Sequence, residues 1–101
     1  MLTSKERAAL RAIASQTDAI FQIGKGGVGE AMCRSLADAL EARELIKISV
    51  LENAAVPAKE SANEIADLLG AEVVAVIGRK IVLYKKAAKE ENRKISANLS
   101  L

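Results

Sequence analysis

The chain has 101 residues, half of them hydrophobic, and a formal net charge of +2. This length fits a single small domain. There is no histidine and one cysteine, Cys33, which excludes histidine-based catalytic triads, histidine-ligated zinc and an internal disulfide. No apolar run has the length of a membrane span, and no signal peptide is recognisable. We therefore expect a cytoplasmic protein with no metal, no cofactor and no membrane partner.

Positive charge is concentrated near the C-terminus. Residues 79–94 contain seven Lys and Arg against two acidic residues, whereas residues 1–78 contain eight basic and eleven acidic ones. A basic segment on a mildly acidic body favours a polyanionic partner such as a nucleic acid. The same charges are also typical of a solvated tail that keeps a protein soluble, so charge leaves both interpretations open.

Capping and helix-breaking residues divide the chain into alternating helices and strands. Thr3 and Glu6 form a capping-box pattern that starts the first helix. Pro57 suits the first turn of a later helix, and Gly70 suits its end. The predicted elements, in chain order, are helix 4–15, strand 19–23, helix 31–43, strand 45–51, helix 57–69, and strands 72–77 and 81–84. The last two strands are close enough in sequence to form a hairpin.

The element order αβαβαββ predicts an α/β (α+β) fold. Each strand–helix–strand step favours a right-handed parallel crossover, and the final hairpin adds an antiparallel strand. The result is a four-stranded mixed sheet with helices packed on it. Phe21 and Tyr84 are the only aromatic residues, so the core must be aliphatic, and we expect Tyr84 to lie in it. We expect the domain to span residues 1–86 and residues 87–101 to form a basic tail, either helical or flexible, because apolar periodicity fades there.

A glycine-rich turn lies between the first predicted strand and the second helix. Gly24, Lys25, Gly26 and Gly27 spell G-x-x-G, the loop with which some small domains clamp a nucleic-acid backbone. Glycines let a ligand approach the backbone closely, and a helix N-terminus adds unpaired N–H groups and a positive dipole end. The turn is therefore a candidate phosphate site. Glycine here can equally serve only to form a tight strand-to-helix turn.

The same segment contains the dinucleotide-binding fingerprint. Gly24, Gly26 and Gly29 spell G-x-G-x-x-G, and Glu52 stands roughly where a ribose-binding acid is expected. Against this, a full doubly wound domain is longer, a helix precedes the first strand, and the last two strands form a hairpin. A P-loop fits less well, because Lys25 is not followed by Ser or Thr. A small nucleotide-binding domain therefore stays an alternative.

Four segments of the chain carry a family resemblance. They are Leu2-Thr3-Ser4-Lys5, Ile23-Gly24-Lys25-Gly26-Gly27, the run from Ala39 to Ile48 and the run from Val76 to Lys85. In order and spacing they resemble the bacterial YhbY-like family, stand-alone members of the CRM (chloroplast RNA splicing and ribosome maturation) domain, over roughly residues 2–85. One departure is Val28-Gly29, where the family commonly has Leu-Thr, so no hydroxyl is available to cap the second helix.

The resemblance implies a fold like the C-terminal domain of translation initiation factor three, a mixed four-stranded sheet whose last strand is antiparallel to the others. It also implies a non-catalytic RNA-binding protein that associates with ribosomal RNA or large-subunit precursors and assists ribosome assembly. RNA is then the expected partner of a monomer with no small-molecule substrate. With so few aromatic side chains, phosphate contacts and RNA shape should outweigh base stacking.

The expected RNA-binding residues combine the G-x-x-G loop, carried over from the resemblance, with basic residues chosen by their charge. They are Gly24, Lys25, Gly26, Gly27, Lys47, Arg79, Lys80, Lys85 and Lys86. An interaction module, in which this basic surface binds acidic protein surfaces, is a further alternative.

Overall fold

The computed structural model describes residues 2–101 and contains the predicted elements with small shifts at their ends. The elements are α1 (Ser4–Ala14), β1 (Phe21–Ile23), α2 (Glu30–Arg43), β2 (Leu45–Val50), α3 (Ala58–Leu69), β3 (Glu72–Ile77), β4 (Lys80–Tyr84), the 3-10 helix η1 (Glu90–Asn92) and α4 (Lys94–Leu99). The capping box forms, since the Glu6 amide donates to Thr3 Oγ1 and the Thr3 amide donates to Glu6 Oε1. Gly70 ends α3 in the left-handed conformation, with φ 66°.

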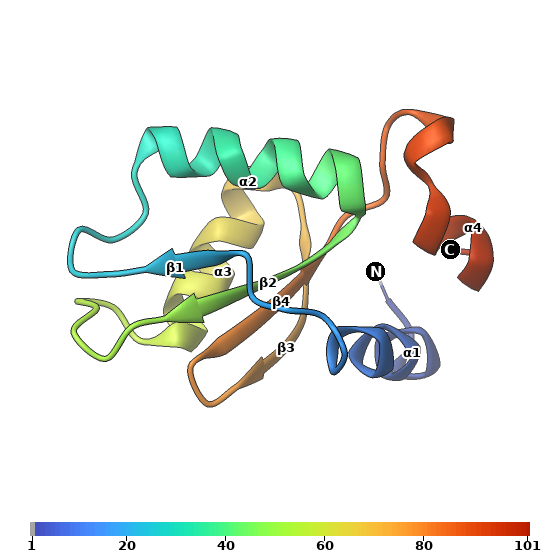
Figure 1. The fold of residues 1–101 in the computed structure, drawn as a ribbon. Helices are drawn as coiled ribbons and strands as arrows, with labels where there is room; N and C mark the ends of the chain where they lie inside the picture. The colour runs from blue at the N-terminus through green and yellow to red at the C-terminus, as the bar shows by residue number, and fades with distance from the viewer. Residues whose placement is uncertain (1) are drawn as a thin grey trace.

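The four strands form one mixed sheet in the order β1-β2-β4-β3 (Figure 1). β1 and β2 are parallel, whereas β4 is antiparallel to both β2 and β3. β3 and β4 are joined by the two residues Gly78 and Arg79, and Gly78 has φ 59°, as the first residue of a type II′ hairpin turn requires. The predicted α/β fold, with the order αβαβαββ and a four-stranded mixed sheet, is confirmed.

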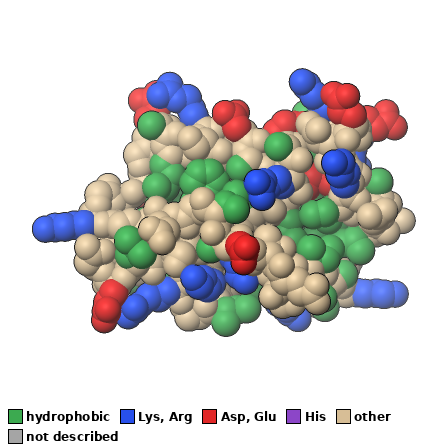
Figure 2. All heavy atoms as spheres, viewed as in Figure 1, with side chains coloured by type: hydrophobic (Ala, Val, Ile, Leu, Met, Phe, Trp, Pro, Cys, Tyr) green, Lys and Arg blue, Asp and Glu red, His purple; other side chains and the backbone are tan. Residues whose placement is uncertain are grey.

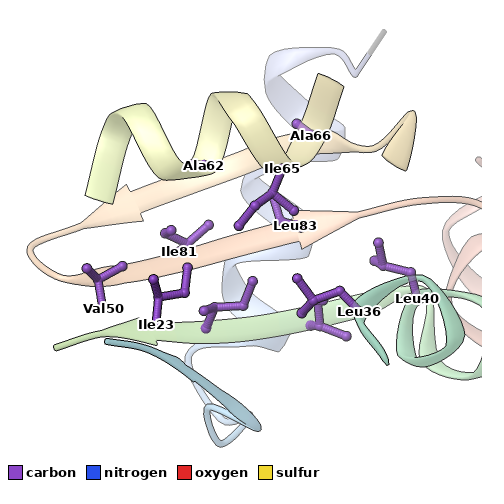
Figure 3. Packing of buried hydrophobic residues seen from close by; sticks show 11 residues of the cluster. Ile23, Leu36, Leu40, Val50, Ala62, Ile65, Ala66, Ile81 and Leu83 are labelled. Carbon is purple, nitrogen blue, oxygen red and sulfur yellow. The ribbon is translucent and has the colours of Figure 1, made fainter. Parts of the chain in front are cut away.

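Helices α2 and α3 cover one face of the sheet with an aliphatic core. Figure 3 shows Leu36 of α2 and Ile65 of α3 directed toward Ile81 and Leu83 on β4 and Ile23 on β1. These five side chains are at most 1% exposed. This core holds the carboxyl end of β1 and the start of α2 in place, and the glycine-rich turn connects those two elements.

Helices α1 and α4 cover the opposite face. Leu10 of α1 is buried against Val82 and Tyr84 of β4, and Ile95 and Leu99 of the α4 segment pack against the same cluster. β4 is therefore buried on both faces, and Tyr84, 5% exposed, lies in the core as expected. None of the helices among residues 2–101 is long and apolar enough to cross a bilayer.

The C-terminal segment, residues 87–101, is attached to the end of α2 by two glutamates. Glu44, at the α2 C-cap and completely buried, accepts hydrogen bonds from the backbone amides of Ala87, Ile95 and Ser96 and from the Ser96 hydroxyl, at 2.7–3.0 Å. Glu41 accepts from the amides of Ala88 and Lys89 and from the Asn92 side chain, at 2.7–3.2 Å. The segment is therefore folded, with one short 3-10 helix and one short α-helix.

The hydrogen bonds to Glu44 change its acidity. Burial by itself would raise the pKa of this carboxyl, but the bonds from Ser96, Ala87 and Ile95 stabilise the ionised form and together lower the pKa below its ordinary value. The same kind of bonds, from Asn92 first and then from Ala88 and Lys89, lower the pKa of Glu41. Both carboxylates therefore stay charged at neutral pH.

Acidification is expected to detach the C-terminal segment. Because the folded-state pKa of Glu44 is depressed, its stabilisation is complete above the unfolded value of about 4.3 and is lost as the pH falls through the folded value. Near-UV circular dichroism of Tyr84, the only tyrosine in a chain without tryptophan, measures this because α4 packs against its cluster. In Glu44→Gln, which cannot titrate, the pH dependence should weaken; an unchanged titration in that variant would contradict the assignment.

Candidate nucleic-acid interface

The turn from Gly24 to Gly27 projects into solvent. The Gly27 amide donates to the Gly24 carbonyl at 3.0 Å, which closes the turn, and Gly27 adopts φ 70°, a conformation that favours glycine. Lys25 and Gly26 are exposed, and a Cβ added at Gly26 would meet no atom within 4 Å. Both the Lys25 ammonium and the Gly26 backbone are therefore open to a ligand.

Helix α2 starts immediately after this turn without a side-chain cap. Gly29 is the N-cap residue in an extended conformation, and its carbonyl accepts the first helical hydrogen bond from the Cys33 amide at 3.0 Å. Glycine supplies no hydroxyl or carboxylate for the other amides of the first turn. The expected departure from Leu-Thr therefore leaves these backbone donors next to the glycine-rich turn.

The β3–β4 hairpin lies at the same end of the sheet as the glycine-rich turn, on the left in Figure 1. Two backbone bonds join the loops there: the Leu51 amide donates to the Ile23 carbonyl at 2.8 Å, and the Val50 amide donates to the Arg79 carbonyl at 2.7 Å. We call this region the glycine-loop end. It comprises Gly24–Gly27, Leu51, Glu52, Gly78, Arg79 and Lys80.

Two of the expected basic residues lie on the hairpin at this end. Lys80 Nζ donates to Ser49 Oγ at 3.0 Å, and Arg79 Nη2 lies 3.8 Å from Glu52 Oε1. Both side chains are exposed. The tertiary structure therefore places Arg79 and Lys80 at the same end of the sheet as Lys25, although more than fifty residues separate them in the sequence.

The other expected basic residues lie elsewhere. Lys47, half-buried in β2, donates to the carbonyls of Ala14 and Thr17 at 3.0 and 3.3 Å and thereby satisfies the C-terminal end of α1. Lys85 and Lys86 follow Tyr84, which pairs with the first residue of β2, so they lie at the opposite end of the sheet from the glycine-rich turn. Lys85 Nζ donates to the Leu69 carbonyl at 2.8 Å.

Charged residues that are not among the expected RNA-binding residues also lie near the glycine-loop end. Arg34, one turn into α2, is 3.8 Å from Glu30, and its side chain is 73% exposed. The spacing of four residues is a local signal that identifies this pair from sequence. Glu52 and Arg79 are 27 residues apart, so no such signal exists for them. Figure 2 shows basic side chains next to acidic ones toward the left, so this surface carries charges of both signs.

Other kinds of site find little support in the described part of the chain. Residues 2–101 contain no group of three histidine, cysteine or acidic side chains that could hold a metal ion. Cys33 is a free thiol, half-buried on α2. Tyr84 is buried, and burial followed by the nearby negative charge of Glu44 raises the pKa of its hydroxyl. Tyr84 is therefore no exposed platform on which a base could stack.

Comparison with known protein families gives a match over most of the chain. The model of the CRS1 / YhbY (CRM) domain matches residues 2–85. The chain belongs to this family. CRM domains are a non-catalytic, RNA-binding family, so the expectation that the chain is not an enzyme is confirmed.

Two relatives of this CRM protein span nearly the whole chain. In Bacillus subtilis (strain 168), a protein named "Probable RNA-binding protein YqeI" is 46% identical over an alignment of 99 residues that covers 94% of this chain and 97% of the relative. The solution structure of SAV1595 from Staphylococcus aureus has a TM-score of 0.75 and 44% identity, covering 89% of this chain and 94% of that one. The match to the first relative must therefore extend into the C-terminal segment, which lies beyond the family model.

Proposed function

We propose that this CRM protein binds ribosomal RNA through the glycine-loop end and assists the assembly of the large ribosomal subunit. The observation that carries the proposal is the exposed Lys25-Gly26 turn at the uncapped start of α2, at the same end of the sheet as Arg79 and Lys80. Membership of the CRM family and the name of the B. subtilis relative support RNA as the partner. The ribosomal assignment follows from the resemblance to YhbY-like proteins.

The chemistry of this surface suits the phosphate backbone of RNA. Gly26 leaves room for a phosphate oxygen to approach the backbone, and the first amides of α2 carry the positive end of the helix dipole. Lys25 adds a mobile ammonium, whereas Arg79 can bind a phosphate through two N–H groups. Phe21 and Tyr84, the two aromatic side chains, are half-buried and buried, so stacking of bases contributes little.

The remaining expected residues take secondary parts in the proposal. Lys85 and Lys86 are exposed and would contact RNA only where it reaches the opposite end of the sheet. Lys47 would have to give up its bonds to the carbonyls of Ala14 and Thr17 before it could bind a phosphate. We therefore assign the main contacts to Lys25, Arg79 and Lys80, together with the backbone of the glycine-rich turn.

Binding is expected to depend strongly on salt. Each phosphate contact contributes a slope of about −0.7 to −0.9 in a plot of log K against log salt, so three contacts predict a slope of about −2 to −3. Fluorescence anisotropy with a labelled, structured ribosomal RNA fragment, measured from about 50 to about 200 mM salt, checks this. An absence of binding at the lowest salt would contradict RNA as the partner. Binding that does not change with salt would contradict the phosphate account.

A further inference from the structure

The glycine-loop end contains an ion pair between its own residues. Glu52 Oε1 lies 3.8 Å from Arg79 Nη2, and the two side chains are 85% and 60% exposed. An arginine proposed to bind phosphate therefore already faces a carboxylate. The second ion pair near this end, Glu30 with Arg34 at 3.8 Å, shows the same combination on the first turn of α2.

The position of Glu52 is set by the sheet. β2 lies between β1 and β4. At its carboxyl end, the Leu51 amide donates to the carbonyl of Ile23, the last residue of β1, and the Val50 amide donates to the carbonyl of Arg79, the turn residue just before β4. Glu52 follows directly and so stands between the glycine-rich turn and the hairpin. A phosphate that contacts Arg79 therefore comes close to this carboxylate.

The pair is weak enough to exchange for another anion. Exposed ion pairs contribute little because both charges are well solvated and long side chains lose freedom when they pair. A phosphate also offers Arg79 a negative charge, and two of its oxygens can accept hydrogen bonds from two N–H groups of the guanidinium at once. At the same time, Glu52 repels any phosphate that approaches Arg79. The carboxylate therefore opposes RNA binding in two ways.

We propose that Glu52 is an exchangeable counterion of Arg79, which leaves Glu52 for an RNA phosphate on binding, and that Glu52 thereby lowers the RNA affinity of this site. The inference rests on the proposed function, and it assigns to an acidic residue the role of lowering the RNA affinity of the glycine-loop end. Glu52 is exposed, so its replacement by glutamine should leave the fold intact.

A double-mutant cycle tests the proposal with the labelled ribosomal RNA fragment. Wild type, Glu52→Gln, Arg79→Gln and the double variant are compared at one low salt concentration. Glu52→Gln should bind about two- to five-fold more tightly, the range that an exposed ion pair supplies. In the Arg79→Gln background the same change should give a smaller gain, because only the repulsion of phosphate is then relieved.

Glu90→Gln is the matched control. Glu90 is an exposed glutamate on η1, and its replacement alters the net charge by the same amount. If Glu90→Gln raised the RNA affinity as much as Glu52→Gln does, the effect would come from net charge alone and the proposal would be overturned. An unchanged or lower affinity in Glu52→Gln, or an equal gain with and without Arg79, would also overturn it while leaving RNA binding in place. Failure of the wild type to bind RNA would remove the proposed function and this inference together.

Discussion

Glu44→Ala is expected to lower the free energy of unfolding by about 3 kcal/mol, because it leaves several buried donors without an acceptor. The Glu44 carboxylate accepts hydrogen bonds from the amides of Ala87, Ile95 and Ser96 and from the Ser96 hydroxyl, and Glu44 is completely buried. Without it, the C-terminal segment must either keep unpaired N–H groups or detach from the domain. Detachment would expose the apolar cluster that contains Tyr84.

Urea unfolding followed by far-UV circular dichroism measures the stability, and near-UV circular dichroism of Tyr84 reports whether the segment stays attached. Glu91→Ala is the control, since Glu91 is exposed on η1 and surface changes of this kind usually stay within about 0.5 kcal/mol. A Glu44→Ala variant as stable as this control would show that the buried carboxylate contributes nothing.

Glu44→Gly separates the carboxylate from the backbone conformation at the same position. Glu44 adopts φ 65°, a value at which glycine is normally preferred after a helix. If the position mattered only for its conformation, glycine would stabilise the protein. We expect Glu44→Gly to destabilise it instead, by less than Glu44→Ala, because the relief of backbone strain offsets part of the lost hydrogen bonding.

The double variant Lys25→Asp, Gly26→Asp is expected to weaken RNA binding about 10- to 100-fold, the loss that removal of one or two charge-assisted contacts produces. The change replaces the ammonium with a carboxylate and places a second one where the turn is open. Gly26 has no positive φ, so aspartate fits its backbone and the fold should be retained. Anisotropy titration with the ribosomal RNA fragment measures the effect.

Ser4→Asp, Lys5→Asp is the matched control for charge. Both residues are exposed in the first turn of α1, where acidic residues are compatible with the helix dipole. Leu2 and Glu6, beside them, line a pocket of about 290 Å³ together with Tyr84 and Lys85. Tyr84 and Lys85 lie at the end of the sheet opposite to the glycine-rich turn, so the start of α1 is also at that opposite end. We expect this control to bind within about three-fold of wild type, as loss of a remote charge contributes little. Equal binding by both double variants would make the turn a structural feature only.

Local signals in the sequence determine most of the secondary structure. The capping box at Thr3, the left-handed Gly70 and the two-residue turn at Gly78 act within a few residues, so their effect can be predicted without the fold. β1 is shorter than expected and begins at Phe21. The Ile20 amide still donates to the Lys47 carbonyl at 3.0 Å, so the residue before β1 keeps a hydrogen bond to β2 although it lies outside the strand.

The distribution of the basic residues could be obtained only from the tertiary structure. Charge alone groups Lys47, Lys80 and Lys85 as equivalent cations. In the fold, Lys47 donates to the end of α1 and Lys85 to the end of α3, whereas Lys80 stays at the glycine-loop end. Lys47 and Lys85 are held by backbone carbonyls that are distant from them in sequence. No local sequence pattern predicts such contacts, so the sequence does not show which lysines are free to bind a ligand.

The sequence by itself therefore determined the order of helices and strands, the sheet class and the position of the glycine-rich turn, because capping, turn formation and apolar periodicity are short-range. Only the tertiary structure decided that the segment after residue 86 is folded, since its amides pair with Glu41 and Glu44 across 43 to 52 residues. It likewise decided that Arg79 faces Glu52 at the glycine-loop end, because strand order brings those residues together.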